Sequence, residues 1–369
     1  MVRMLTVLAA LLLSAVGCAK SADPEAAPPP PRTSAWAAIV DADAHGAIVL
    51  DGADQTYRGI RRDGSTAWRR PAGERDPMAV ACTARCPDAV LSGSILAMTQ
   101  PGVPDPQPRL ILGGRAQPLA GVGGHHRRVL TAAGPQDFVA ATGDRRGRRR
   151  VELHRGGRQP TLLPVDGPPT WQESPDGRVA LLAVAGPAGA TTPGNQARWF
   201  TRQAGGWRPA GATVPVRGGG ACVAGDGRAL LLGQPPAILH RAGQQEPITD
   251  LEDAGTCDLA ASGGIVAELA QHQDGLRARV RAVDARGSVL WRRDLPGEVA
   301  VTADPTTPLA AYLADATLQE VDLRSGRALP TVPGVLAARY DGAGGLVTVG
   351  LDGDLTWRPA GHPATAGSR

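Results

Sequence analysis

The sequence predicts an all-β protein, a β-propeller of seven blades, with eight blades as the alternative. Three observations lead to this fold class. A hairpin motif that contains Trp-Arg recurs along the chain, short apolar segments are bounded by Gly, Asp or Pro, and the 369 residues include 48 Gly and 33 Pro. Because Gly and Pro weaken long helices, this composition excludes helical bundles and coiled coils.

The hairpin motif is clearest at three places. Residues 64–70 read Gly-Ser-Thr-Ala-Trp-Arg-Arg, residues 287–293 read Gly-Ser-Val-Leu-Trp-Arg-Arg, and residues 353–358 read Gly-Asp-Leu-Thr-Trp-Arg. The Asp and Gly positions supply turn chemistry and positive φ, and the strand that follows carries a large flat side chain that packs between sheets. Such units recur at intervals of roughly 35–50 residues, which is the period of four-stranded propeller blades. A sandwich pair or a β-helix is the structural alternative.

The apolar segments 46–50, 179–183, 229–232 and 345–350 have the length and boundaries of strands. A propeller hides its exposed sheet edges when one blade is built from both chain ends. We therefore expect the first strands, around 36–40 and 47–50, to share a sheet with the last strands, around 346–349 and 355–357.

Two segments resemble a known repeat family. Residues 282–291 read Ala-Val-Asp-Ala-Arg-Gly-Ser-Val-Leu-Trp. This is similar to the Ala-x-Asp-x-x-Thr-Gly-x-x-x-Trp signature of quinoprotein-like (PQQ-like) propeller repeats, one residue shorter and without the Thr. Asp322 and Gly326 keep the full spacing, with Ser325 at the Thr position. Such repeats occur in quinone-cofactor dehydrogenases and in non-catalytic envelope lipoproteins, so the resemblance implies fold and location rather than activity.

Residues 1–17 are expected to be a lipoprotein signal peptide. Arg3 precedes an apolar run of about twelve residues, too short to span ~30 Å of hydrocarbon. The sequence Ala15-Val-Gly-Cys18 resembles a bacterial lipobox, whose cysteine is diacylated and becomes the new N-terminus. We therefore expect lipidation at Cys18 and an extracytoplasmic protein anchored to the cell membrane of a bacterium. An ordinary cleaved secretion signal is the alternative.

The rest of the chain divides simply. Residues 18–34, with four consecutive prolines at 28–31, predict a disordered Pro/Ala-rich tether. A single propeller domain is expected over residues 35–361, and a flexible tail over 362–369.

The formal net charge of +4 is too small to indicate a nucleic-acid partner. We expect a monomeric propeller.

Four cysteines remain in the predicted propeller. In an exported protein, Cys82, Cys86, Cys222 and Cys257 are expected to form two disulfides. Cys82 and Cys86 would close a tight local loop. Cys222 and Cys257 lie about one repeat apart and could pair across adjacent units. A zinc site, or a redox role for Cys82 and Cys86, is the alternative.

No motif in the chain defines an active site. A quinone-cofactor enzyme needs a calcium-binding carboxylate cluster and a catalytic acid, but the candidate acids Asp144, Asp253 and Asp258 have no distinguishing context. Residues 41–46 begin like a calcium loop but lack its later ligands, so they predict a turn. His125 and His126 would point to opposite faces of a strand. We therefore expect no catalytic residue, no cofactor and no metal.

One charge run stands out. Arg145, Arg146, Arg148, Arg149 and Arg150 occupy five of six positions and indicate contact with an anionic surface. A solvated turn is the alternative for this segment.

Together these features predict a membrane-anchored, non-enzymatic lipoprotein. Its propeller would act as a scaffold or accessory factor for an unidentified envelope or secreted protein. One alternative is a degenerate quinoprotein-type enzyme with carboxylates scattered across its blades. Another is a lectin-like or small-ligand sensor that uses the central funnel and Trp171 or Trp199, although packing between blades is the simpler role for these indoles.

Overall fold

The computed structural model describes residues 37–361, apart from 84, 95, 98–102, 104–105, 120–126, 144–148, 166–168, 175–176, 185–195, 204–205, 216–219, 225, 227, 233–236, 242–243, 249–253, 261 and 273–274. The signal peptide, Cys18, the tether and the tail predicted from the sequence lie outside the described residues. Among the described residues there is no helix with the length and apolar composition that a membrane span requires.

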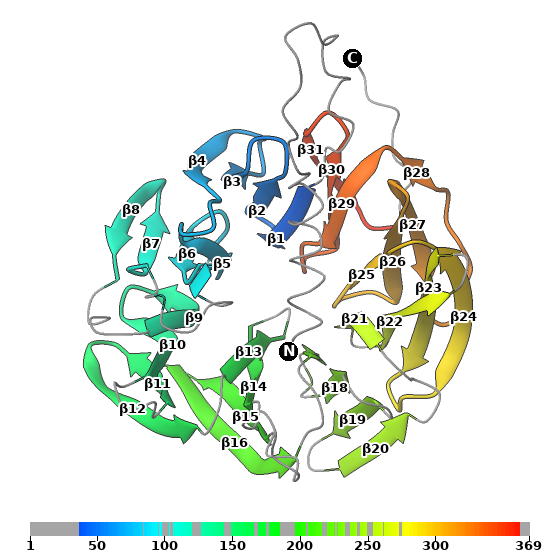
Figure 1. Ribbon diagram of the computed structural model, residues 1–369. Coiled ribbons are helices and arrows are strands. Elements are labelled where there is room, and N and C mark those ends of the chain that lie inside the picture. Colours follow the sequence, from blue (N-terminus) through cyan, green and yellow to red (C-terminus); the bar gives the residue numbers. More distant parts are fainter. Residues whose placement is uncertain are drawn as a thin grey trace, which may run out of the picture.

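The described strands form eight antiparallel sheets arranged as blades around a central axis (Figure 1). Blades 1 to 4 contain β1 (Ala37–Asp43), β2 (Gly46–Asp51), β3 (Thr56–Arg61), β4 (Thr66–Pro71); β5 (Met78–Cys82), β6 (Ala89–Ser92), β7 (Arg109–Leu112), β8 (Arg115–Pro118); β9 (Arg127–Gly134), β10 (Asp137–Gly143), β11 (Arg149–Arg155), β12 (Arg158–Val165); and β13 (Pro169–Glu173), β14 (Val179–Val184), β15 (Gln196–Gln203), β16 (Gly206–Pro215).

Blades 5 to 8 continue in the same order around the ring. They contain β17 (Gly220–Val223), β18 (Arg228–Leu232), β19 (Ala237–Arg241), β20 (Gln244–Ile248); β21 (Ala254–Ala260), β22 (Gly263–His272), β23 (Gly275–Asp284), β24 (Val289–Pro296); β25 (Ala300–Ala303), β26 (Leu309–Ala314), β27 (Thr317–Asp322), β28 (Val332–Pro333); and β29 (Val335–Tyr340), β30 (Gly345–Gly350), β31 (Leu355–Pro359). The first strand of each blade faces the axis and the last lies at the periphery (Figure 1). The all-β propeller is confirmed, and of the two predicted blade numbers the described strands form the larger.

The turns explain why the repeated motif forms hairpins. Asp284 ends β23, and its carboxylate oxygen Oδ1 accepts hydrogen bonds from the backbone N–H groups of Arg286 and Ser288. Gly287 in this turn has a φ of +88°, a conformation that disfavours side chains with a Cβ. The chain then enters β24, which carries Trp291. The Asp and Gly of the motif therefore close the turn as predicted.

The core consists of apolar layers between neighbouring blades. Between blades 1 and 2, for example, Ile48 and Trp68 pack with Leu91 and Ile111, all almost completely buried. Alternate residues on each strand serve the two opposite faces of a blade, so every blade is apolar on both sides. All six described tryptophans pack against these clusters: Trp68, Trp171, Trp199, Trp207, Trp291 and Trp357. This confirms packing between blades as their role, Trp171 and Trp199 included.

Each peripheral strand carries at least one proline. The prolines are Pro71 in β4, Pro118 in β8, Pro160 and Pro164 in β12, Pro209 and Pro215 in β16, Pro247 in β20, Pro296 in β24, Pro333 in β28 and Pro359 in β31. A peripheral strand has one unpaired edge, which invites pairing with another chain. Proline lacks the N–H donor and interrupts such pairing, so these positions protect the outer edges.

The ring closes differently from our expectation. The first and last strands do not share a sheet: β1 to β4 form one complete sheet, and β29 to β31 form a separate sheet of three strands. The β1–β2 turn is held locally, because Oδ1 of Asp43 accepts hydrogen bonds from the backbone N–H groups of His45 and Gly46. This turn commits β1 to its own blade. Closure instead comes from packing, in which Ala47 and Val49 of blade 1 meet Val347 and Val349 of blade 8.

Candidate functional site: the inner rim and the blade 3 groove

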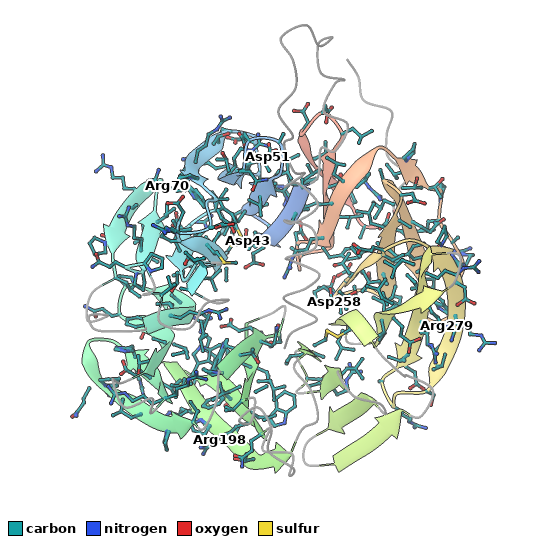
Figure 2. The ribbon with its side chains drawn as sticks, viewed as in Figure 1. Asp43, Asp51, Arg70, Arg198, Asp258 and Arg279 are labelled. Atoms are coloured by element: carbon teal, nitrogen blue, oxygen red, sulfur yellow. A yellow bond between two sulfur atoms is a disulfide. The ribbon has the colours of Figure 1, made fainter. Side chains whose placement is uncertain are left out.

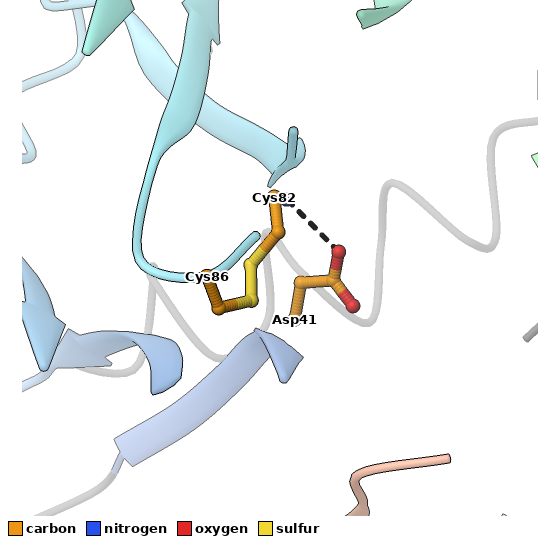
Figure 3. Close-up of side chains that lie close together, drawn as sticks. All are labelled: Asp41, Cys82 and Cys86. Atoms are coloured by element: carbon orange, nitrogen blue, oxygen red, sulfur yellow. Dashed lines mark hydrogen bonds between the residues drawn. A yellow bond between two sulfur atoms is a disulfide. The ribbon is translucent and has the colours of Figure 1, made fainter. Parts of the chain in front are cut away.

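Side chains link the innermost strands from blade to blade, and we call these contacts the inner-rim links. Asp41 on β1 accepts a hydrogen bond from the backbone N–H of Cys82 on β5, at 2.9 Å (Figure 3). Asp43, two residues further, accepts one from the backbone N–H of Cys86, at 2.8 Å. Both carboxylates of the segment that begins like a calcium loop therefore hold blade 1 to blade 2, and the predicted turn forms at Ala44 and His45, between β1 and β2.

Both expected disulfides are present. The Cys82–Cys86 bond closes the loop after β5, with a Cα–Cα distance of 5.1 Å. The Cys222–Cys257 bond joins β17 to β21 across neighbouring blades, with a Cα–Cα distance of 6.0 Å. Ligand atoms of Asp41, Cys82 and Cys86 lie within 4.8 Å of one another. Their two sulfurs are bonded to each other, however, and a metal ligand must be a thiolate. The four cysteines are therefore structural in this arrangement.

Asp258 on β21 is the inner-rim link between blades 6 and 7 (Figure 2). Its Oδ2 accepts hydrogen bonds from the backbone N–H of Ala303, at 2.8 Å, and from the hydroxyl of Thr302, at 3.1 Å. Its Oδ1 accepts one from the backbone N–H of Leu259. Burial raises the pKa of the Asp258 carboxyl above its usual value, while these hydrogen bonds and the charge of Arg339 act in the opposite direction.

Arg339 on β29 holds the junction at which the ring closes. Its guanidinium donates a hydrogen bond to the backbone carbonyl of Val40, at 3.3 Å, and lies 3.4 Å from the carboxylate of Asp41. Asp41 thus contacts β29 on one side and β5 on the other. The arginine is about half exposed, so its ion pair contributes little energy on its own. The structural role of Arg339 is to join the first and last blades.

Glu173 at the end of β13 is a rim acid that sequence reasoning missed. The indole N–H of Trp171 donates a hydrogen bond to its carboxylate, at 2.9 Å. Burial raises the pKa of Glu173, and the nearby negative charge of Asp41 acts in the same direction, whereas hydrogen bonds from Thr131 and Trp171 oppose it. Because Thr131 lies on β9, Glu173 links blades 3 and 4. The Trp171-x-Glu173 spacing was the available signal, since alternate strand residues share a face.

The described rim is therefore an assembly of structural contacts. Of the three candidate acids, Asp258 uses both carboxylate oxygens in hydrogen bonds, and Asp144 and Asp253 lie outside the described residues. His125 and His126 also lie outside them. Asp41, Asp43, Glu173 and Asp258 each hold two neighbouring blades together, and this arrangement can fix a rigid frame whose faces consist of turns and loops.

The charge run falls partly on a described strand. Arg145, Arg146 and Arg148 lie outside the described residues, while Arg149 and Arg150 begin β11 and are exposed. The guanidinium Nε of Arg150 donates a hydrogen bond to the carboxylate of Glu152, at 3.0 Å. Contact of this run with an anionic surface stays a prediction.

A groove of about 480 Å³ lies on blade 3. Its charged and aromatic lining residues include Arg150, Glu152, His154, Arg158 and Phe138. The imidazole of His154 stacks on the ring of Phe138, with ring centroids 4.0 Å apart, and its Nε2 lies 3.0 Å from the buried carboxylate of Glu152. Sequence reasoning identified Arg150 but not the groove, because the lining residues come together only when β10, β11 and β12 pair.

Comparisons with known proteins identify the fold. No protein-family model matches the chain, and no curated protein matches it in sequence. Among solved structures, the chain is similar to BamB from Moraxella catarrhalis, with a TM-score of 0.50 and 16% identity over 87% of this chain and 94% of that one. It is also similar to Sqt1 from Chaetomium thermophilum, with a TM-score of 0.50 and 14% identity over 80% and 84% of the two chains.

A third neighbour belongs to a different class. A prolyl endopeptidase structure matches with a TM-score of 0.52 and 11% identity, covering 87% of this chain but 54% of that one. At such low identity these likenesses show the fold alone. They agree with the propeller predicted from the repeated motif in the sequence, and the protein is a β-propeller.

Proposed function

We propose that this protein is a membrane-anchored extracytoplasmic lipoprotein whose non-catalytic propeller is a scaffold or accessory factor at the bacterial cell envelope. The observation that carries the proposal is the use of the inner-rim groups. Asp41, Asp43 and Asp258 accept hydrogen bonds from the neighbouring blade, and Cys222 and Cys257 join two blades covalently. These groups make a rigid frame, and a rigid frame that presents loops is suited to recognition.

Two further features support the proposed location. The lipobox-like sequence before Cys18 supplies a lipid anchor, and the proline-rich residues 18–34 would hold the propeller away from the membrane surface. The two disulfides suit an oxidising compartment outside the cytoplasm. We infer a protein partner in the envelope or among secreted proteins.

The test is affinity capture of the full-length lipidated protein from membranes after chemical cross-linking, with the Cys18→Ser variant as its matched control. We expect metabolic labelling with a fatty acid to mark the wild type and not the variant. We also expect one defined envelope protein to be captured in a saturable way. Turnover of a supplied substrate by the purified protein, with no partner captured, would overturn the proposal.

A further inference from the structure

The groove on blade 3 exists because strands of neighbouring blades differ in length. The outer strands β7 and β8 of blade 2 have four residues each, whereas β11 has seven and β12 has eight. All the residues that line the groove lie between Pro135 and Leu162, within blade 3. No described residue of the previous blade lines this part of the face, and the groove between the described residues is open to a ligand.

The floor of the groove is a fixed polar cluster on an aromatic base. The side chain of Glu152 is only 4% exposed, and its Oε1 accepts hydrogen bonds from Arg150 and from the hydroxyl of Thr142. Its Oε2 faces His154, which is stacked on Phe138. The negative charge of Glu152 is thus already matched by groups of the protein.

The rim of the groove carries an excess of positive charge. Arg155 and Arg158 line it in addition to Arg150, so the lining holds three arginines and one glutamate. Arg158 belongs to the turn end of β12 and is exposed. A ligand that complements this rim carries carboxylates or other oxyanions, which guanidinium groups bind with paired hydrogen bonds.

The groove also has an apolar wall. Leu162 on β12 is 49% exposed and is one of three exposed large hydrophobic side chains among the described residues. It lines the groove together with Pro160. A single exposed leucine is ordinary, but here it borders a concave, cationic surface, and the combination selects a ligand with both charge and an apolar side chain.

We propose that the blade 3 groove binds an acidic peptide segment of a partner protein, with carboxylates at Arg158 and Arg150 and an apolar side chain against Leu162. The prolines of β12 oppose addition of the segment as an extra strand, so side chains make the recognition. This inference rests on the proposed function, because it names the chemistry by which the scaffold holds its partner.

The test uses an array of random octapeptides probed with the purified wild-type propeller and with Arg158→Glu and Leu162→Asn. Each variant has a matched control. Arg149→Glu makes the same charge change on the neighbouring face of β11, and Leu351→Asn removes a leucine that is 60% exposed on blade 8. Thermal melting of all four variants verifies that they fold.

We expect peptides bound by the wild type to be enriched in Asp and Glu together with an apolar residue. Arg158→Glu should weaken their binding about tenfold and Leu162→Asn should weaken it as well, while the two controls bind like the wild type. Peptide binding with no acidic enrichment, or an unchanged peptide set with Arg158→Glu, overturns the inference. Binding to phosphatidylglycerol vesicles through Arg158, without acidic-peptide binding, also overturns it.

Membrane capture separates the two proposals. If a partner is captured equally by the wild type and by Arg158→Glu, the groove assignment fails and the scaffold proposal stands. If no partner is captured while the acidic peptides bind through Arg158, the scaffold proposal fails and the peptide site stands.

Discussion

Trp68 in blade 1 donates its indole N–H to the backbone carbonyl of Pro87 in blade 2, at 2.6 Å. The same relationship recurs five blades along the chain, where the indole of Trp291 in blade 6 donates to the carbonyl of Leu323 in the next blade, at 2.9 Å. Trp357 occupies the corresponding third position of β31, but its Nε1 is buried without a hydrogen-bond partner among the described residues. Tryptophans at equivalent strand positions therefore differ in this hydrogen bond, which Trp68 and Trp291 make and Trp357 lacks among the described residues.

This difference predicts the cost of replacing each indole. Trp68→Phe and Trp291→Phe should lower the free energy of unfolding by about 1–3 kcal/mol beyond the loss of ring area, since each leaves a carbonyl without its partner. Trp357→Phe removes an unpaired donor and should be clearly the mildest of the three. Urea denaturation of the purified variants measures the differences. Equal costs at the three positions would show that the hydrogen bonds contribute nothing.

The glycine beneath Trp68 should be equally sensitive. A Cβ placed on Gly59 would overlap the indole of Trp68, so Gly59→Ala must displace the ring from its hydrogen bond. We expect Gly59→Ala to destabilise the protein by about 1–3 kcal/mol, the usual cost of overpacking. In a Trp68→Ala background the same substitution should cost much less, because the clash is gone. A double-mutant cycle measures the coupling, and additive effects would contradict this account.

The tryptophan motif reveals the hairpins but not the number of blades. Among the described residues, outer strands β8, β12, β20 and β28 contain no tryptophan. The motif does not mark these four blades, which can be inferred only from the spacing between predicted strands. Proline is the more regular signal, because every outer strand carries one. Its physical cause is protection of an unpaired edge, which each blade needs regardless of how its core is packed.

Ring closure could not be predicted from the terminal strands alone. The apolar pattern of these strands shows that they are buried, and in the structure they are buried against each other. The pattern does not say whether the strands pair through hydrogen bonds in one sheet or only pack face to face. The local turn at Asp43 decides the pairing of β1. The disulfide partners could be anticipated because Cys222 and Cys257 lie one repeat apart. The groove and the role of Glu173 could not be predicted, since both depend on contacts between strands whose register the sequence does not give.

Asp258, the buried link between blades 6 and 7, should give the stability of the protein an unusual pH dependence. Burial raises the pKa of its carboxyl in the folded protein above the ordinary value of 3.8, so the folded state retains this proton at pH values where the unfolded chain has lost it. Its contribution to stability is therefore greatest at low pH and falls as pH rises from about 4 through the folded pKa. The difference in unfolding free energy between the wild type and Asp258→Asn should decrease over that range and then become constant.

Asp322 provides a control of opposite sign. Backbone hydrogen bonds from Ser325 and Arg324 lower the pKa of Asp322, so its contribution to stability is present above the unfolded pKa and is lost as pH falls. The difference between the wild type and Asp322→Asn should therefore increase with pH. Urea unfolding at several pH values between 3 and 7 measures both series. A difference for Asp258→Asn that rises with pH would show that its hydrogen bonds, rather than burial, control its ionisation.

The two disulfides should differ in their contribution. Reduction of the Cys222–Cys257 bond opens a loop of 35 residues between neighbouring blades, whereas the Cys82–Cys86 bond spans four residues. Chain entropy predicts a loss of about 4 kcal/mol for the paired Cys222→Ser and Cys257→Ser variant and about 2 kcal/mol for Cys82→Ser with Cys86→Ser. The free energy of unfolding measures both. A larger loss at the local disulfide would mean that its contacts with Asp41 and Asp43 outweigh loop entropy.

The prolines of β12 should keep the propeller monomeric. The register of β12 with β11 continues on both sides of Pro164, and it shifts between Thr161 and Arg158, the stretch that contains Pro160. Proline within a sheet occurs on edge strands with its nitrogen toward solvent, or at bulges, so we expect both missing donors to belong to the free edge. The double variant Pro160→Val and Pro164→Val restores two donors there and raises strand propensity, so we expect association that increases with protein concentration, measured by sedimentation velocity. Thr161→Val raises strand propensity without adding a donor and should stay monomeric. If the double variant also stays monomeric, the edge is protected by something other than its prolines.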